Sequence, residues 1–384
     1  MDILVACDSF KESLTAEAVV QAIIGGFREI YPDARYHAFP MADGGEGTAA
    51  IMARTLGGRL ETRDVCGPLG VPVSARFAVL DHGRTALIEL AEAAGLAQTP
   101  LESRSPLFTT TYGVGELISA ALDMGCRHLV LALGGSATCD GGAGLLQALG
   151  VSLRDLHGQE IPHGGGPLGA VFSLDDDRLD PRLAECRIEI LCDVTAPLLG
   201  ETGAVAVFGP QKGATPAMIP LLEASLARLA SLVELRCGRD LTAVEGMGAA
   251  GGAALGLVGL CGARLVPGAE AVAGLLGLGT LVSQMDLVIT GEGRLDRQTA
   301  QGKAPQAIAT LAKKAGKPVI AFAGTLGAGH EDLLATGFDA VFSCLERPCT
   351  LGEAFGEAEQ ALRRCARNVA ATLALGRSFQ AAQA

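Results

Sequence analysis

The chain has 384 residues, is 49% hydrophobic and carries a formal net charge of −12. This length favours two domains of ordinary size, and the apolar content excludes an intrinsically disordered chain. The sequence contains no basic patch interleaved with aromatic residues, which argues against nucleic acid as a partner. An acidic protein of this kind must bind anions locally, through backbone amides, single basic side chains or Mg²⁺.

The sequence contains only weak signals for a cellular compartment or a membrane span. The eleven cysteines form no C-x-x-C pair, which favours buried thiols in a reducing compartment over disulfides or a zinc site. The first residues lack the basic start of a signal peptide, so we expect a cytoplasmic protein. Residues 246–263 carry no charge, but their many Gly and Ala residues favour a buried helix and loop over a membrane span.

In chain order, strand-like apolar runs alternate with helical patterns. The first run, 3–7, precedes an amphipathic helix whose apolar positions extend from Ala16 to Ile30, with Thr15 as its N-cap and Pro32 beyond its end. Six more runs are predicted strands: 36–42, 128–133, 187–192, 285–290, 318–323 and 340–344. Continuous apolar strands separated by helices predict a parallel sheet that is covered on both faces.

Residues 59–90 follow a different pattern. Their apolar residues come closer to strict alternation, and turn signals at Gly67-Pro68 and His82-Gly83 separate the runs. This predicts an antiparallel or mixed sheet, and hints at a second domain inserted into the first.

Acidic and glycine-rich segments follow most of the predicted strands. These segments are Asp8-Ser9-Phe10-Lys11, 43–47, 134–138 with Asp140, Asp193, 291–294 with Asp296, and Gly324-Thr325. Ligands of open α/β sheets bind at the carboxyl ends of the strands, so this edge would gather carboxylates, hydroxyls and glycine amides. Any one of these loops could be only a turn or a helix cap, but caps do not require Gly-Gly or Gly-x-Gly beside the acid.

Carboxylates in glycine-rich loops suit phosphoryl transfer. Mg²⁺ prefers carboxylate and phosphate oxygens, and a carboxylate can accept the proton of an attacking hydroxyl. The segment DGGEG at 43–47 carries two acids and no lysine. We therefore expect this loop to face a polyhydroxy substrate or a metal, with phosphates held elsewhere.

Other motifs leave alternatives open. Residues 301–304 fail the Walker pattern at both ends. Gly246-x-Gly-x-x-Gly251 matches a dinucleotide fingerprint without a convincing strand before it, so an NAD(P)-dependent oxidoreductase is one alternative. The segment 134–138 nearly imitates a nucleophile elbow, which leaves a hydrolase open. A non-enzymatic ligand-binding protein with two closing domains is a further alternative.

Six segments together resemble the class I glycerate kinases. They are ACDSFKESLTAEAVVQAI (6–23), PMADGGEGT (40–48), LALGGSATCDGG (131–142), LCDVTAPL (191–198), GPQKGA (209–214) and ITGEGRLDRQTAQGK (289–303). The resemblance runs in consistent order to about residue 345. It implies ATP- and Mg²⁺-dependent phosphorylation of D-glycerate, most often at the 2-hydroxyl to give 2-phospho-D-glycerate and ADP; phosphorylation at the 3-hydroxyl is the alternative.

The resemblance also implies a fold: two α/β domains with the active site between them. One would be a discontinuous flavodoxin- or Rossmann-like domain with a parallel sheet, over 1–62 and 283–384. The other would be an inserted α/β domain with a mixed sheet, over 63–282. A monomer or a homodimer is expected, with D-glycerate and ATP as its small-molecule partners.

Site roles follow from the same resemblance. The expected substrate-binding residues are Asp8, Ser9, Lys11, Asp43, Gly44, Gly45 and Glu46. The expected nucleotide-binding residues are Gly134, Gly135, Ser136, Thr138, Lys212, Glu292, Arg294 and Lys303. Asp193, Lys11 and Asp43 are the expected catalytic residues, and Asp193, Glu292 and Asp296 the expected metal ligands. For these residues the alternative is a purely structural role. In that case Lys11, Lys212 and Lys303 are ordinary surface charges. Asp43 then belongs to a tight turn and Asp193 caps a helix.

Overall fold

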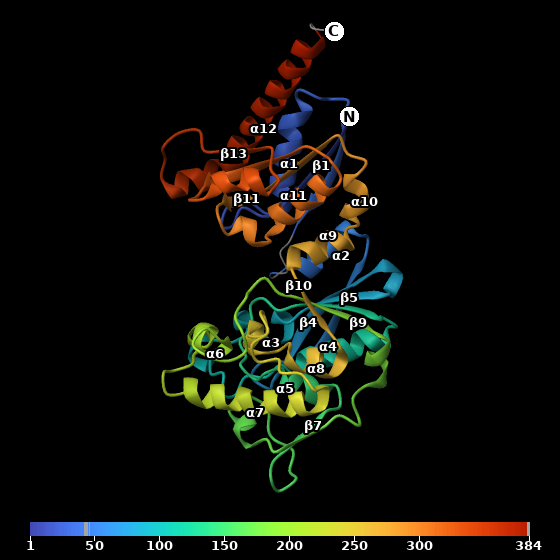
Figure 1. Ribbon diagram of the computed structural model, residues 1–384, viewed down its shortest axis with the longest axis vertical. Coiled ribbons are helices and arrows are strands. Elements are labelled where there is room, and N and C mark those ends of the chain that lie inside the picture. The colour runs from blue at the N-terminus through green and yellow to red at the C-terminus, as the bar shows by residue number, and fades with distance from the viewer. Residues whose placement is uncertain (42–44, 46, 382–384) are drawn as a thin grey trace. The chain divides into compact units, whose positions relative to one another are not determined.

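The computed structural model describes residues 1–41, 45 and 47–381 (Figure 1). Its backbone contacts divide it into two compact units. The terminal unit contains 1–41 and 267–381, and the inserted unit contains 45 and 47–266. The domain boundaries predicted near residues 62 and 282 stay predictions.

The terminal unit is built on five parallel strands in the order β13-β12-β11-β1-β2. The strands are β1 (Asp2–Cys7), β2 (Arg35–Pro40), β11 (Leu287–Leu295), β12 (Val319–Leu326) and β13 (Ala340–Ser343). The helices are α1 (Ala16–Arg28), α9 (Gly268–Leu275), α10 (Leu278–Val282), α11 (Ala304–Lys314) and α12 (Leu351–Ala381). Numbered within this unit alone, the strand order is 2-1-3-4-5, the flavodoxin-like order, which confirms the predicted fold class.

Strand β1 is buried on both faces, as its continuous apolar sequence predicts. Ile3 and Val5 pack in one core with residues of α1 and α12, and Leu4 and Ala6, on the opposite face of the strand, are also 0% exposed. Helix α1 begins where predicted, because the Thr15 hydroxyl accepts a hydrogen bond from the Ala18 amide at 3.2 Å.

The inserted unit contains the mixed sheet that the sequence predicts, in the order β10-β9-β6-β5-β4-β3. Strands β3, β4 and β5 pair antiparallel, whereas β5, β6, β9 and β10 pair parallel. Their bounds are β3 (Arg59–Cys66), β4 (Pro72–Leu80), β5 (Thr85–Glu89), β6 (His128–Ala132), β9 (Arg187–Leu191) and β10 (Arg264–Val266). A separate hairpin pairs β7 (Ser152–Arg154) with β8 (Ser173–Asp175).

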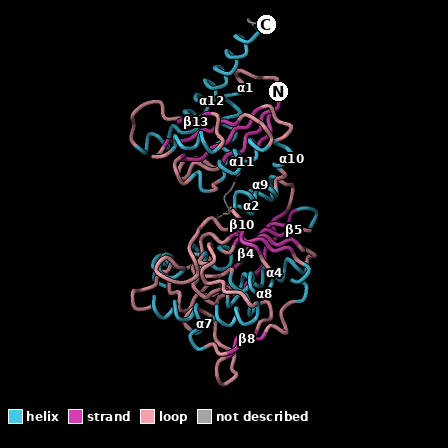
Figure 2. The backbone as a smooth tube through the Cα atoms, viewed as in Figure 1, coloured by secondary structure: helices cyan, strands magenta, loops and turns pink. Residues whose placement is uncertain are grey.

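Helices and long loops cover this sheet (Figure 2). The helices are α2 (Thr48–Thr55), α3 (Ala91–Ala94), α4 (Tyr112–Asp123), α5 (Ala143–Ala148), α6 (Ala204–Phe208), α7 (Ile219–Cys237) and α8 (Leu255–Cys261). No helix in the described ranges combines the length and apolarity that a membrane span requires. All eleven cysteines are free, but the expectation of buried thiols holds only in part: four are buried, six are partly buried and Cys349 is exposed.

The uncharged stretch 246–263 folds as a buried turn followed by helix α8. A loop, not a strand, separates Gly246 from helix α7, so the strand–turn–helix geometry of a dinucleotide fingerprint is not formed. A Cβ added to Gly251 would lie 2.1 Å from the Thr138 carbonyl oxygen, and the backbone angle φ of Gly251 is +68°. This glycine therefore serves close backbone packing against the loop that follows β6.

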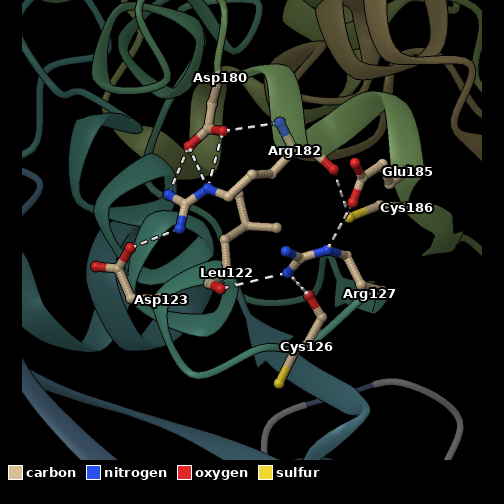
Figure 3. Close-up of polar contacts among 8 residues, drawn as sticks. All are labelled: Leu122, Asp123, Cys126, Arg127, Asp180, Arg182, Glu185 and Cys186. Carbon is tan, nitrogen blue, oxygen red and sulfur yellow. Dashed lines mark hydrogen bonds and ion pairs between the residues drawn. The ribbon is translucent and has the colours of Figure 1, made fainter.

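An ion-pair cluster stabilises the amino-terminal edge of this sheet (Figure 3). The Arg182 guanidinium donates to Asp180 Oδ2 at 2.7 Å and to Asp123 Oδ1, at the end of α4, also at 2.7 Å. Arg127, just before β6, donates to the Cys126 carbonyl at 2.8 Å and to Glu185 Oε2 at 3.3 Å. The Arg182 guanidinium lowers the pKa of Asp180. The cluster thus joins the end of α4 to the segment that leads into β9.

We predict that Arg182→Lys lowers the free energy of unfolding by about 1 kcal/mol at pH 7, because an ammonium cannot reproduce the forked contact with Asp180 and the bond to Asp123. Since the folded state lowers the pKa of Asp180, this stabilisation is present above pH 3.8 and is lost as the pH falls further. Urea denaturation at pH 7 and pH 3.5 measures both effects. Arg178→Lys, at an exposed position nearby, is the matched control. Equal losses for the two variants would refute the role of the cluster.

Candidate functional site

A cavity of about 400 Å³ lies in the terminal unit at the carboxyl ends of β1, β11 and β12. This edge includes the point between β1 and β11 where the strand order reverses, which is where doubly wound sheets bind ligands. Seven residues that the sequence singles out line the cavity: Asp8, Ser9, Lys11, Glu292, Arg294, Asp296 and Lys303. Asp43, Gly44 and Glu46 lie outside the described residues.

Glu292 is the most enclosed acid of this cavity. Its side chain accepts a hydrogen bond from the Thr299 hydroxyl at 2.6 Å, and Lys303 Nζ lies 3.4 Å from its other oxygen. Burial raises the pKa of Glu292, while the Thr299 hydroxyl and the Lys303 charge oppose that rise. Lys303 is therefore half-buried and paired, not a solvated surface charge.

The strand that carries Glu292 is longer than predicted. The sequence predicts a strand over 285–290 followed by a loop, but β11 continues to Leu295 and pairs Glu292 with Ala323 and Arg294 with Thr325. Gly291 permits this pairing, because a Cβ there would lie 2.2 Å from the Phe322 carbonyl oxygen.

The remaining charges of the cavity are more exposed. Arg294 Nε lies 3.1 Å from Asp296 Oδ2, and the Arg294 side chain is 64% exposed. Asp296 also accepts the Gln298 amide at 2.9 Å, and Asp8 accepts the Ser9 amide at 2.6 Å. With Lys11, the cavity holds three carboxylates and three basic side chains. Oppositely charged groups in one cavity suit a ligand that brings both a cation and phosphates.

The predicted glycine-rich loop of the inserted unit follows β6. Its backbone is held by hydrogen bonds from the Leu96 amide to the Gly135 carbonyl and from the Ala137 amide to the Ala94 carbonyl, both 2.8 Å. Gly134 is exposed, whereas Ser136 is 6% exposed and Thr138 is 0% exposed. A nucleophile elbow presents its serine at an exposed turn, so the buried Ser136 does not form one.

Two buried charges lie beneath this loop. Lys212 is 2% exposed, and its Nζ donates to the Thr138 carbonyl at 2.7 Å. Asp140 is 0% exposed and accepts hydrogen bonds from the Thr111 amide and hydroxyl, both at 2.8 Å. Burial lowers the pKa of Lys212 and raises the pKa of Asp140. The interpretation of Lys212 as an ordinary surface charge is wrong: it holds the loop in place.

Asp193 lies in an exposed loop just after β9. It belongs to the inserted unit, whereas Glu292 and Asp296, the other predicted metal ligands, belong to the terminal unit. Within the described part of the chain, a triplet of acids with oxygens within 4.8 Å of one another occurs instead at Asp175–Asp177. The role of Asp193 stays a prediction.

Glu89 is a buried acid of the inserted unit that the sequence did not single out. It ends β5, is 4% exposed and accepts the Gly47 amide at 2.9 Å and the Ala49 amide at 2.6 Å. It therefore caps α2 directly after the predicted substrate loop at 43–47. The signal was present in the sequence TALIE, where one acid directly follows three apolar residues at the end of the strand.

Comparison with known proteins decides the family. The profile described as "Glycerate kinase family" matches residues 3–374. The chain belongs to the glycerate kinase family. It is 48% identical to the "Glycerate 2-kinase" of Escherichia coli K12 over 380 residues, which covers 98% of this chain and 99% of that protein. It is 45% identical over 368 residues to the "Glycerate kinase" of Halalkalibacterium halodurans, covering 96% and 97% of the two chains.

A solved structure agrees. A crystal structure from Salmonella typhimurium LT2, provisionally named glycerate kinase 2, superposes with a TM-score of 0.89 at 49% identity. It covers 98% of this family member and 99% of its own chain. The resemblance noted from the sequence is thus confirmed at the level of family and fold.

We predict that the buried ammonium of Lys212 makes stability depend on pH. Because the folded state lowers its pKa, the unfolded chain binds this proton more tightly, and stability rises with pH from the folded pKa up to about 10.5. The difference in free energy of unfolding between the wild type and Lys212→Met should therefore grow between pH 7 and pH 10 in urea titrations. Lys314→Met, at an exposed lysine, is the matched control. A flat difference for Lys212→Met would contradict the assignment.

Proposed function

We propose that this chain transfers a phosphoryl group from ATP, with Mg²⁺, to D-glycerate, giving 2-phospho-D-glycerate and ADP. The observation that carries this proposal is the cavity at the switch point between β1 and β11, which gathers three carboxylates and three basic side chains. The family supports the substrate, and the name of the Escherichia coli relative supports the 2-hydroxyl.

The basic residues of the cavity supply charge for the phosphates. Transfer of a phosphoryl group is favoured by positive groups that stabilise its equatorial oxygens. We assign this role to Arg294 and Lys303, with Lys11 shared between a phosphate and the glycerate carboxylate. The pairing of Lys303 with Glu292 orients the ammonium before any ligand binds.

The donor set of the cavity fits Mg²⁺. This ion is usually held by one or two carboxylates together with substrate phosphates, and Glu292 and Asp296 offer two carboxylates within one cavity. Bound there, Mg²⁺ would neutralise charge on the phosphates. Glu292 is ionised for this role only above its raised pKa, and Lys303 and Thr299 favour that ionised form.

Glycerate hydroxyls need acceptors, which Asp8 and Ser9 provide at the end of β1. From the sequence, Asp43, Gly44, Gly45 and Glu46 complete this set. Among these four, Gly45 is described: its carbonyl accepts the Thr48 hydroxyl at 2.6 Å, at the start of α2.

The glycine-rich loop of the inserted unit is assigned to the nucleotide phosphates. Its accessible part is Gly134 and Gly135, whose backbone can approach a phosphate closely. The Thr138 hydroxyl is buried and has no hydrogen-bond partner among the described residues. Lys212 contributes by holding this loop through the Thr138 carbonyl.

The decisive test is phosphorus NMR of the purified protein with ATP, Mg²⁺ and D-glycerate. We expect a 2-phosphoglycerate signal that requires all the components. A 3-phosphoglycerate signal would keep the kinase and reassign the reacting hydroxyl. A folded sample that forms no phosphorylated glycerate would refute the proposed substrate.

Asp193 is proposed as the general base or as a ligand of Mg²⁺. We predict that Asp193→Asn lowers kcat by about a hundredfold or more, the usual range for a general base, with the fold intact by circular dichroism. Asp177→Asn, at an exposed acid of the same unit, should leave kcat unchanged. Near-wild-type turnover by Asp193→Asn would exclude both roles.

A further inference from the structure

The cavity of the terminal unit has an apolar wall that the chemistry above does not use. This wall is the first turns of α12, which contribute Leu351, Ala354, Phe355, Ala358 and Ala361. Their spacing of three and four residues places them along one side of the helix. Leu351 remains 67% exposed within the unit, so the wall presents apolar surface to the cavity.

Helix α12 holds this wall in a fixed place. Further along the helix, Leu362, Ala366 and Ala370 are 0% exposed and pack in the core with α1. The contact is close, because a Cβ added to Gly26 of α1 would lie 2.4 Å from the Arg363 carbonyl oxygen. The first turns of α12 therefore extend from a packed helix along the cavity, as a preformed surface.

Glycerate alone does not explain this wall. It is a three-carbon acid whose groups are nearly all polar, whereas about 400 Å³ lies within the range of pockets that hold much larger ligands. The charged residues of the cavity come from the segment after β1, from β11 and from the segment after β11. The apolar residues come mainly from α12, with Phe10, Cys344 and Leu345 beside them. A ligand with a flat aromatic ring at one end and phosphates at the other matches this division.

We infer that the nucleoside of ATP binds in this cavity, with its purine ring against Phe355 and Leu351 and its phosphates toward Arg294 and Lys303. The inference rests on the proposed function, in that it takes ATP as the phosphoryl donor. Phe355 supplies an aromatic face on which the base stacks, and Leu351 and Ala358 supply apolar contact. Specificity for a nucleoside triphosphate over inorganic polyphosphate would then come from α12.

The test is calorimetric titration of the full chain with ADP. We expect Phe355→Ala to raise the Kd for ADP about tenfold or more, the effect typical of removing a ring that stacks on a base. Phe355→Leu, which keeps apolar bulk without the ring, should give a smaller rise in the Kd for ADP. If the alanine variant does not fold, the leucine variant is used to test the inference. The KM for glycerate should stay at the wild-type value in both variants. Phe108→Ala removes a phenylalanine that is 69% exposed in the inserted unit, and serves as the matched control.

Unchanged ADP affinity in both Phe355 variants, or equal losses for ADP and glycerate, would overturn the inference. The phosphorus NMR experiment separates this outcome from failure of the proposed function. If 2-phosphoglycerate forms and ADP affinity is unchanged, the kinase stands and the base binds elsewhere. If no phosphorylated glycerate forms but Phe355→Ala weakens ADP binding, the nucleotide site stands and the acceptor differs.

Discussion

The parallel pairing of β1 with β11 is the interaction on which the candidate site depends. The register places Cys7 opposite Gly291, and the Asp8 amide donates to the Gly291 carbonyl at 2.9 Å. Residues almost three hundred positions apart in the sequence thereby end their strands at the same edge. A register shift of one residue would turn Glu292 to the other face of the sheet, away from the cavity. Precision at this edge thus comes from backbone hydrogen bonds in the core, not from the charged side chains themselves.

The inserted unit orders its glycine-rich loop with buried charged side chains, an arrangement that costs more free energy. Burying an ammonium and a carboxylate carries a large desolvation penalty, which hydrogen bonds offset only in part. Lys212 and Asp140 are both buried: Lys212 donates to the Thr138 carbonyl of the loop, and Asp140, just after the loop, accepts the Thr111 amide. Because glycines such as Gly251 have no side chain, the neighbouring backbone can approach the loop closely. This arrangement favours one loop conformation over overall stability, which suits the proposed role of the loop in binding nucleotide phosphates.

Much of the fold was predictable because the strands of a doubly covered sheet are continuous apolar runs. The runs at 3–7 and 318–323 became β1 and β12 with small changes at their ends. The residues that directly follow the strands were therefore also predictable. In the structure, these residues lie together and supply charged side chains to the cavity of the terminal unit. The extension of β11 was not predictable, since its Gly-x-Gly segment has the composition of a turn and pairs only because β12 lies beside it.

Burial of single charged residues was equally invisible in the sequence. Lys212 follows Gly-Pro-Gln with no local pattern that distinguishes it from a solvated lysine. Its enclosure is set by residues more than seventy positions away, at Thr138. The apolar wall on α12 was hidden for a similar reason, because a helical stripe looks the same whether it packs on a core or lines a cavity.

The division of the terminal unit between the two ends of the chain has a consequence for synthesis. The inserted unit is continuous in sequence and has all its strands once Val266 has been made. Strand β1, in contrast, has only the edge strand β2 beside it until β11 appears, about 280 residues later. At roughly 5–20 residues per second, this apolar strand waits on the order of 15–60 seconds for its partner. The nascent chain therefore carries this apolar strand without its central partner through most of translation, and the inserted unit is the first part able to fold.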